Sequence, residues 1–480
     1  MERLINSTAS NVFNNFVKLN KIPRCSNQEE EVSNYLKMFG ESLGLTTIQD
    51  EFLNIYIKKP ATIGYENHEG VILQAHMDMV CEKTEDSDHD FCKDPIEIRV
   101  EGDYVRANKT TLGADNGIGV ALALDILEND TIAHPPIEVI ITATEETGMD
   151  GVIGLSKDLL KGKKLINIDT EEEGTLIIGC AGGINSYLDL NIKRVEAETK
   201  KTVKISLSGL KGGHSGMTIG SNNINAIKLI SEYIRKIKTE IPMSLFAING
   251  GTKHNAIPSQ AEITVGMDSD DLDKFKEVYT RITNEYVENS LKREPDISFS
   301  YEELGEENVF IDSDDAKKML NLIQLLPHGV NTMDGETDQV QSSNNLAIVR
   351  TGDDKFNISI SIRSSKEEER ENLINKVEEV AKLVGATMTL SEGYPMWEPK
   401  EVSALKEVAR ISYKELTEKE LNISTIHAGL ECGIISEKYP DMDMISIGPD
   451  IEGAHTPEEK LSIKSTEFIR EYIYDILARL

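Results

Sequence analysis

Short apolar runs that alternate with helical stretches are the feature that most narrows the fold of this 480-residue chain. The expected strands are Val71–Ala75, Ile137–Thr144, Leu165–Ile168 and Met442–Ile447, and one expected helix is Gly119–Leu127. Strands buried on both faces of a parallel sheet read as continuous apolar runs, and helices connect them. The sequence therefore predicts an α/β domain with a mostly parallel sheet flanked by helices.

The pattern of apolar residues changes at about Gly183 and changes back near Tyr394. A single hydrophobic core stops growing at roughly 250–300 residues, so we expect this chain to divide into domains. The prediction is a first domain of residues 1–183 and 394–480, interrupted by an inserted α+β domain of residues 184–393. A strand followed by a helix, at Asn357–Ile362 and Lys366–Leu383, resembles a partial repeat of an earlier unit, so the insert could be internally duplicated. The earlier unit contains Thr202–Ser208, Ile224–Ile237, Ala261–Met267 and Leu272–Tyr286.

Charge and composition exclude several classes of partner. Asp and Glu number 83 against 51 Lys and Arg, a formal net charge of −32, which disfavours binding to nucleic acid and to anionic membranes. No run approaches the roughly 20 apolar residues of a membrane span, and the first residues are polar. We therefore expect a cytoplasmic protein.

The five cysteines indicate neither a disulfide framework nor a zinc ribbon. Their number is odd, they are widely spread, and no Cys-x-x-Cys pair occurs, which fits a reducing cytosol. Cys81 and Cys432 fall near the site segments described below, where we expect them to pack as small buried side chains.

A capping box is predicted at Ser26–Glu29, with serine as the helix cap and glutamate three residues later. Apolar residues then recur at helical spacing at Val32, Tyr35, Leu36, Phe39 and Leu43. The sequence therefore predicts an amphipathic helix that starts at this box.

Residue types that bind metal ions follow each of the four apolar runs. They are His76 and Asp78, Glu145 and Glu146, Asp169, and, after the run that ends before Gly448, His455. Ligands bind outside the carboxyl ends of the strands in an open α/β sheet, so these distant residues are expected to converge. Asp115 precedes the helix Gly119–Leu127 at the same edge, where it could cap the helix or bind metal.

Two histidines with several carboxylates suit zinc or another first-row divalent ion, and cobalt or manganese could substitute. His76 and Asp78 are two residues apart on an extended segment, so Asp78 can accept the imidazole N–H. Adjacent Glu145 and Glu146 suggest that one binds metal while the other accepts a proton from water, although the spacing does not say which.

Two other motifs superficially indicate a phosphate-binding loop and a serine hydrolase, and both indications are weaker than that of a metal site. The segment Gly117-Ile118-Gly119 lacks the remaining glycines and the lysine of phosphate-binding loops. The segment Gly213-His214-Ser215-Gly216 is out of register with the G-x-S-x-G element of serine hydrolases. Convergence of the metal-ligand residues therefore remains the favoured interpretation.

These residues resemble the family of co-catalytic di-zinc aminopeptidase-like dipeptidases, and most closely its aminoacyl-histidine (Xaa-His) dipeptidases. The similarity runs along essentially the whole chain. Its specific segments are Leu73–Val80, Thr111–Gly117, Thr144–Gly148, Asp169–Gly174, Gly212–Gly216, His427–Gly433 and Ile447–Pro449. Their order follows that of the family.

The resemblance implies two zinc ions and the roles of several residues. One ion would be bound by His76, Asp115 and Asp169, and the other by Asp115, Glu146 and His455. Glu145 would be the general base that deprotonates a water bridging the two ions, and Asp78 the partner of His76. The inserted domain would be a lid on the catalytic domain.

Residues of the lid would contact the substrate. The resemblance implies that His214 stabilises the tetrahedral oxyanion, that Asn255 binds substrate, and that Arg363 is a candidate for the substrate carboxylate. His427 and Glu431 would line the site without a defined role.

The implied activity is hydrolysis of unblocked dipeptides, Xaa-His among them. N-acyl amino acids or tripeptides are alternative substrates for the same machinery, and a non-catalytic binding protein on this scaffold is a further alternative. Relatives with a simple lid take the lid histidine from a partner subunit, whereas a doubled lid supplies it within one chain, so a homodimer stays open.

Overall fold

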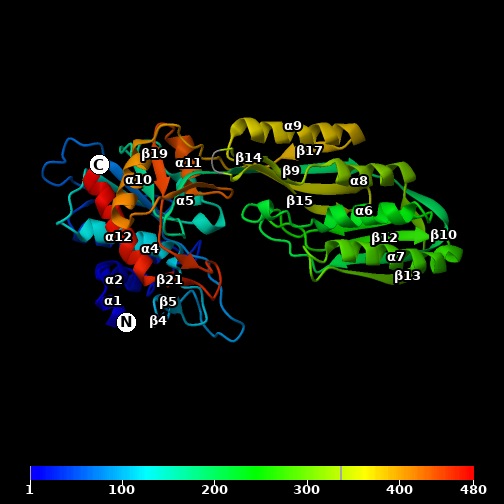
Figure 1. The fold of residues 1–480 in the computed structure, drawn as a ribbon, viewed down its shortest axis with the longest axis horizontal. Helices are drawn as coiled ribbons and strands as arrows, with labels where there is room; N and C mark the ends of the chain where they lie inside the picture. Colours follow the sequence, from blue (N-terminus) through cyan, green and yellow to red (C-terminus); the bar gives the residue numbers. More distant parts are fainter. Residues whose placement is uncertain (1, 336–337) are drawn as a thin grey trace. The chain divides into compact units, whose positions relative to one another are not determined.

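The computed structural model describes residues 2–335 and 338–480, which form two compact units (Figure 1). The first unit extends to Cys180 and continues in Trp397–Thr425 and Leu430–Leu480. The second comprises Ala181–Met396 and Ile426–Gly429. Both ends of the chain lie in the first unit. The expected division at 183/184 and 393/394 did not include the short return of residues 426–429 to the second unit.

An eight-stranded sheet forms the centre of the first unit, in the order β1-β2-β6-β3-β7-β19-β8-β18. The bounds are β1 (Thr46–Gln49), β2 (Ile55–Lys59), β3 (Val71–His76), β6 (Ile137–Thr142), β7 (Lys164–Asn167), β8 (Thr175–Cys180), β18 (Asn422–Ile426) and β19 (Asp443–Ser446). The four central strands pair in parallel, and they are the four strands expected from the apolar runs. β1, β2 and β8 pair antiparallel on either side.

The helices of this unit are α1 (Glu2–Ile5), α2 (Ser10–Leu19), α3 (Glu30–Ser42), α4 (Ala114–Glu128), α5 (Asp150–Gly154), α10 (Ala404–Thr417), α11 (Glu431–Lys438) and α12 (Ile463–Arg479). A small antiparallel sheet contains β4 (Ile98–Glu101), β5 (Tyr104–Ala107), β20 (Ile451–Glu452) and β21 (Lys460–Ser462). α4 is buried along nearly its whole length, as its continuously apolar sequence requires. Within the described residues, no helix combines the length and the apolar character needed to cross a membrane.

The predicted capping box at Ser26–Glu29 is wrong. α3 begins at Glu30, and no side chain caps it. The Ser26 hydroxyl instead donates to Asp78 Oδ2 at 2.7 Å. Glu29 Oε1 accepts the backbone N–H groups of Asn27 at 2.9 Å and Thr144 at 3.0 Å. The side chains of Ser26 and Glu29 therefore bond to Asp78 and Thr144, which are distant in the sequence, and do not form a capping box on α3.

The second unit contains a nine-stranded sheet in the order β13-β10-β12-β11-β15-β16-β9-β17, with β14 paired to β15. Its elements are β9 (Gly182–Asn191), β10 (Arg194–Ser208), α6 (Ala226–Lys238), β11 (Ser244–Gly250), β12 (Ala261–Met267), α7 (Leu272–Ser290), β13 (Ser298–Ile311), α8 (Ser313–Leu325), β14 (Gly329–Met333), β15 (Val340–Thr351), β16 (Lys355–Ser364), α9 (Glu367–Val384) and β17 (Thr387–Leu390).

Its topology repeats. In chain order the first half is β10-α6-β11-β12-α7-β13, and its strands lie in the order β13-β10-β12-β11. The second half is β9-α8-β15-β16-α9-β17, and its strands lie in the equivalent order β17-β9-β16-β15. The first half is inserted after β9 of the second. The topology thus supports the internal duplication that the sequence suggested.

A disulfide joins Cys25 to Cys81, with the two Cα atoms 5.8 Å apart, which contradicts the expectation of unpaired cysteines. The two chain segments run side by side, since Met79 N donates to Arg24 O at 3.1 Å. Spacing in the sequence carries no information about such a tertiary pairing. Cys432 is buried, as expected.

Reduction of this disulfide is expected to lower the free energy of unfolding. The bond spans 56 residues, and closing a loop of that length corresponds to roughly 4 kcal/mol at most. Urea unfolding of oxidised and reduced protein checks the difference, with the Cys25→Ser/Cys81→Ser double variant as the control that should not respond to reductant. Equal unfolding midpoints for the oxidised and reduced native protein would contradict the expectation.

Candidate metal centre and a second polar cluster

Three carboxylates and two imidazoles converge at the carboxyl edge of the central strands in the first unit. His76 ends β3, Asp169 follows β7, and Asp115 lies in the first turn of α4. His76 Nε2 lies 3.1 Å from Asp115 Oδ1 and 3.4 Å from Asp169 Oδ1. The strand register thus brings together residues nearly a hundred positions apart.

His455 approaches the other side of Asp115. Its Nε2 atom lies 3.1 Å from Asp115 Oδ2 and 3.0 Å from Glu146 Oε1. Each oxygen of Asp115 therefore faces a different imidazole. This is the arrangement of a carboxylate that can bridge two cations.

The donor set fits divalent metal ions. The ligand atoms of His76, Asp115 and Glu146 lie within 4.8 Å of one another. Ligands of a tetrahedral zinc ion, at bond lengths of about 2.0–2.1 Å, lie about 3.3 Å apart, close to the separations found here. Hydrogen bonds that the His455 ring donates to the carboxylates of Asp115 and Glu146 also raise the pKa of His455 to about 11, which fits a position where positive charge is favoured.

Asp78 fixes the geometry around His76. It is fully buried, and its Oδ1 lies 3.4 Å from His76 Nδ1. Its two oxygens also accept the backbone N–H groups of Glu145 at 3.0 Å and Glu146 at 3.2 Å. The imidazole is thus oriented by the Asp78 carboxylate together with the Asp78 carbonyl oxygen, 3.2 Å from Nδ1, and the carboxylate also holds the turn that carries both glutamates.

Glu145 lies in a setting that favours its protonated form. Burial raises its pKa well above the usual value, the positive charge of His76 opposes this, and the charges of Asp169 and Glu146 raise it further. The preceding Thr144 has a left-handed backbone, with φ of 56°, which turns the chain sharply after β6. Burial and the neighbouring carboxylates thus act together to favour a proton on Glu145.

Glu431, singled out from the sequence without a role, lies in a buried polar network of the first unit. Its Oε2 atom accepts from Gln74 Nε2 at 2.5 Å and from Thr142 Oγ1 at 2.7 Å. Burial raises its pKa to about 7. Gln74 Oε1 in turn accepts from Asn167 at 2.5 Å. This network ties α11 to β3, β6 and β7 close to the ends that carry the site.

His214 lies in the second unit and presents one ring nitrogen as a donor. Its Nδ1 accepts the backbone N–H groups of Gly216 and Met217, both at 3.2 Å. The other nitrogen, Nε2, therefore carries the proton of the neutral ring. Burial and the charge of Arg363 lower the pKa of His214, so the ring is neutral at neutral pH.

The glycines around His214 explain the motif that superficially resembled a nucleophile elbow. A Cβ on Gly216 would lie 2.5 Å from the His427 carbonyl oxygen, and one on Gly213 would lie 2.2 Å from Thr218 Oγ1. Gly213 also has φ of 122°. The motif is therefore built for close backbone packing beside the imidazole.

Asn255 lies in the turn beside His214. Its carbonyl accepts the backbone N–H of Ser215 at 2.8 Å. The turn is held by Asn345, a buried residue that the sequence reasoning missed, which donates to the carbonyls of His254 at 3.2 Å and Ala256 at 2.8 Å. Nothing local in the sequence marks Asn345, because its partners are nearly a hundred residues away.

Arg363 is a buried cation near the end of β16, only 7% exposed. Its guanidinium donates to the Tyr394 hydroxyl and lies over that ring, 5.9 Å from its centroid. None of the ion pairs found among residues 2–335 and 338–480 involves it. A buried guanidinium without a carboxylate partner among the described residues fits the predicted role of Arg363 in binding an anionic group.

His427 belongs to the same polar region of the second unit. Its Nε2 lies 2.7 Å from Ser343 Oγ. Burial, together with the charge of Arg363, lowers its pKa to about 4, so it is neutral at physiological pH. Arg363 thus influences both His427 and His214. The four candidate residues of the second unit, His214, Asn255, Arg363 and His427, lie far apart in the sequence.

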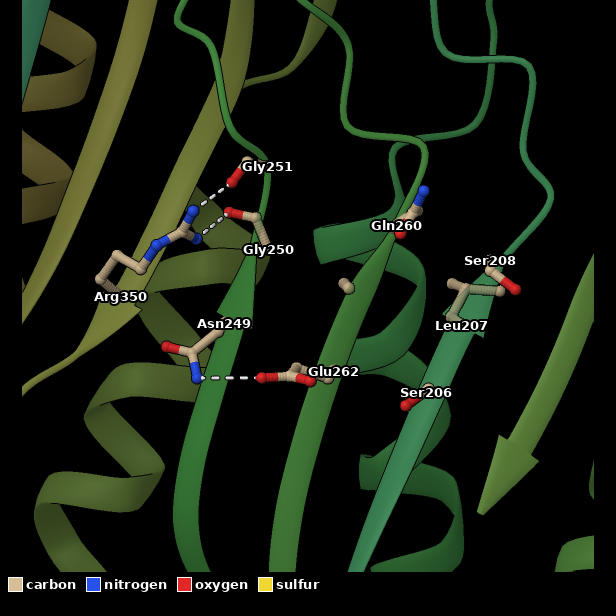
Figure 2. Close-up of a pocket in the computed structure, with 10 residues that line it drawn as sticks. Ser206, Leu207, Ser208, Asn249, Gly250, Gly251, Gln260, Glu262 and Arg350 are labelled. Carbon is tan, nitrogen blue, oxygen red and sulfur yellow. Dashed lines mark hydrogen bonds between the residues drawn. The ribbon is translucent and has the colours of Figure 1, made fainter. Parts of the chain in front are cut away.

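An open hollow of about 510 Å³ lies elsewhere on the sheet of the second unit, over β10, β11 and β12 (Figure 2). Arg350 is the cation beside it, and its guanidinium donates to the carbonyls of Gly250 and Gly251. Asn249 donates to Glu262 at 3.5 Å. The polar side chains of Arg350, Asn249 and Glu262 thus bond to other groups of the lining.

Comparison with known proteins places these residues in context. The sequence model of the protein family described as peptidase family M20/M25/M40 matches residues 72–479 of this chain. The chain is 38% identical over 453 residues to the cytosol non-specific dipeptidase of Escherichia coli, covering 94% of this chain and 93% of that protein. The crystal structure of aminoacylhistidine dipeptidase from Vibrio alginolyticus matches with a TM-score of 0.89 at 37% identity, covering 100% of this chain and 99% of that one. The structure of aminopeptidase PepT from Bacillus cereus, covering 98% of both chains with a TM-score of 0.57 at 16% identity, shares the fold.

Proposed function

Because this chain belongs to peptidase family M20/M25/M40, we propose that it hydrolyses unblocked dipeptides with the help of two divalent metal ions, most simply zinc. The observation that carries the proposal is Asp115, whose two oxygens each face an imidazole. His76, Asp115 and Asp169 would hold one ion, and Asp115, Glu146 and His455 the other. Cobalt or manganese could substitute for zinc.

The chemistry that two bound cations would supply here is Lewis acidity toward the scissile carbonyl and the attacking water. Glu145 takes the proton from the attacking water and delivers it to the leaving amine. Asp78 keeps His76 and the Glu145–Glu146 turn in place throughout. The surroundings that raise the pKa of Glu145 suit a residue that must hold this proton between the two transfers.

Residues of the second unit are proposed to bind the substrate. The Nε2–H of His214 donates to the oxyanion of the tetrahedral intermediate. Asn255 contacts the peptide. Arg363 binds the terminal carboxylate, because a guanidinium can donate two parallel, charge-assisted hydrogen bonds to a carboxylate. His427, paired with Ser343, lines the same region. Recognition of a carboxylate close to the scissile bond would favour dipeptides over longer peptides.

The substrate range is proposed from the relatives. The Escherichia coli relative is named a non-specific dipeptidase and the Vibrio alginolyticus relative an aminoacylhistidine dipeptidase. We therefore include both Xaa-His and other dipeptides. The Escherichia coli relative is named a cytosol dipeptidase, which supports a cytoplasmic location. The net charge of −32 supports the absence of nucleic acid and membrane partners. The duplicated topology of the second unit favours a lid histidine from the same chain, and the proposal leaves a homodimer open.

A panel of amides tests the substrate class. Zinc-loaded protein is expected to cleave Leu-Leu, Gly-His and β-Ala-His, and to cleave Leu-Leu-Leu and N-acetyl-leucine far more slowly. A metal-stripped sample is the control and should cleave none of them. Preferential cleavage of the tripeptide or of the N-acyl amino acid would show that this alternative, and not an unblocked dipeptide, is the preferred substrate of the same active site.

Replacing Arg363 with alanine is expected to raise KM for Leu-Leu by about 10–100-fold with a smaller change in kcat, because a hydrogen bond to a charged group contributes roughly 1.5–3 kcal/mol. The C-terminal amide of the same dipeptide lacks the carboxylate, so its kcat/KM should change little. Arg370→Ala, which removes a cation paired with Glu367 on α9, is the matched control. An equal loss for the acid and the amide would exclude carboxylate binding by Arg363.

A further inference from the structure

The backbone that carries Asp115 lacks a regular conformation of its own. Gly113 is left-handed, with φ of 67°, and Asp115 has φ of −81° and ψ of 110°, outside the helical range. N–H groups in the first turn of a helix have no partners within the helix. The segment of residues 112–115 therefore depends on groups elsewhere in the chain to hold Asp115 in place.

The carboxylate of Glu459 accepts all four of these N–H groups. Oε2 accepts from Leu112 at 2.7 Å and from Gly113 at 2.9 Å. Oε1 accepts from Ala114 at 2.7 Å and from Asp115 at 3.2 Å. Glu459 is only 2% exposed. A single buried anion thus fixes the segment beneath the bridging carboxylate.

Glu459 also belongs to the segment that carries His455. The segment turns tightly, with Thr456 N donating to Gly453 O at 3.2 Å and Glu459 N to Thr456 O at 3.1 Å. The side chain of His455 is 50% exposed, so packing constrains it weakly. Its position therefore depends on the backbone of its own loop, which Glu459 anchors to the Asp115 segment.

Arg24 completes the anchor from the opposite side. Its guanidinium donates to the carbonyls of Gly113 at 2.6 Å and Met77 at 3.1 Å. Burial lowers its pKa to about 10, against the charges of Glu459, Asp78 and Asp115, so it is still a cation at neutral pH. It offsets the buried charge of Glu459 and links the Asp115 segment to the end of β3.

We infer that Glu459 is a positioning residue for the metal ion held by Asp115, Glu146 and His455. The inference rests on the proposed function, which supplies that ion. Loss of Glu459 would make Asp115 and His455, two of the three ligands of that ion, more mobile. His76 and Asp169, which complete the other site, lie on β3 and after β7 and keep their supports. A carboxylate that only capped α4 would lower stability without distinguishing the two ions.

The test compares Glu459→Gln with the native protein. Glutamine keeps the size but presents an NH₂ group to backbone donors. Zinc is titrated into metal-stripped protein against a competing chelator. The variant is expected to bind the ion held by Asp115, Glu146 and His455 about 10–100-fold more weakly, with a clearly smaller loss for the ion held by His76, Asp115 and Asp169, which shares only Asp115. Excess zinc should restore kcat. Glu458→Gln, which alters a neighbouring side chain that is 83% exposed, should behave as the native protein does.

The outcomes separate the inference from the proposed function. If the native protein does not bind two ions, the proposed function itself is contradicted. A native protein that binds two, with a folded Glu459→Gln variant that binds both normally or loses both equally, overturns the positioning role alone. Circular dichroism monitors folding, and Glu459→Asp, which keeps the charge, should lose less affinity for the ion held by Asp115, Glu146 and His455. If neither variant folds, the role is in stability and the inference is overturned.

Discussion

Replacing Glu145 with glutamine is expected to lower kcat for dipeptide hydrolysis by about 10²–10⁴-fold, the range contributed by a positioned general acid–base group. The amide keeps the shape of the side chain and cannot accept the proton of the attacking water. The backbone N–H of Glu145 still donates to Asp78, so the turn that also carries Glu146 should keep its geometry. KM should change little, since the variant removes a proton transfer and no substrate contact.

Metal binding separates this outcome from a collapse of the site. The Glu145→Gln variant should retain the native metal content, and Glu85→Gln, at an exposed position, serves as the control with native kcat. A Glu145→Gln variant with at least one tenth of native kcat would assign the base to another group. Loss of the metal ions in this variant would instead make Glu145 a ligand.

Replacing His214 with alanine is expected to lower kcat by about 10²–10³-fold, the cost of removing one donor to an oxyanion. The structure leaves Nε2–H of the neutral ring as this donor, because Nδ1 accepts the N–H groups of Gly216 and Met217. An interaction made chiefly in the transition state appears in kcat rather than in KM. Metal content should not change, since His214 belongs to the second unit.

The matched control for His214 is His254→Ala, an exposed histidine near Asn255 in the same unit. It should leave kcat unchanged. Because glutamine can donate from its side-chain amide, His214→Gln should recover part of the lost kcat. A His214→Ala variant that loses metal, or one that changes KM alone, would contradict oxyanion stabilisation by this residue.

The centre of the catalytic fold was readable from the sequence because its signal is strong. β3, β6, β7 and β19 are buried strands whose apolar runs hardly fit another element, and each leads to residues with ligand chemistry. The resemblance to a dipeptidase family is confirmed by the match to peptidase family M20/M25/M40 over residues 72–479 together with the two dipeptidase relatives. The roles assigned to individual residues stay predictions.

What could not be predicted depends on tertiary contacts. Ser26 and Glu29 match the pattern of a capping box, yet Asp78 and Thr144 offered them better partners. Cys25 and Cys81 pair because two segments run side by side, which neither their spacing nor the odd cysteine count reveals.

Glu459 is the clearest case of a site residue that the sequence hides. It follows Glu458 in a polar loop, and the two look alike in the sequence. In the fold one is buried against four backbone N–H groups and the other is exposed. Burial, which decides their difference, is a property of the packed loop and not of the local pattern.

The central claim is a centre that holds two metal ions around Asp115, and a metal count tests it most directly. Metal-stripped protein is reloaded with zinc, dialysed against metal-free buffer and analysed for zinc per chain alongside its hydrolysis of Leu-Leu. The account predicts two zinc ions per native chain, with activity that returns on reloading. A native protein that retains no zinc, or that cleaves Leu-Leu at the same rate with and without metal, would contradict it.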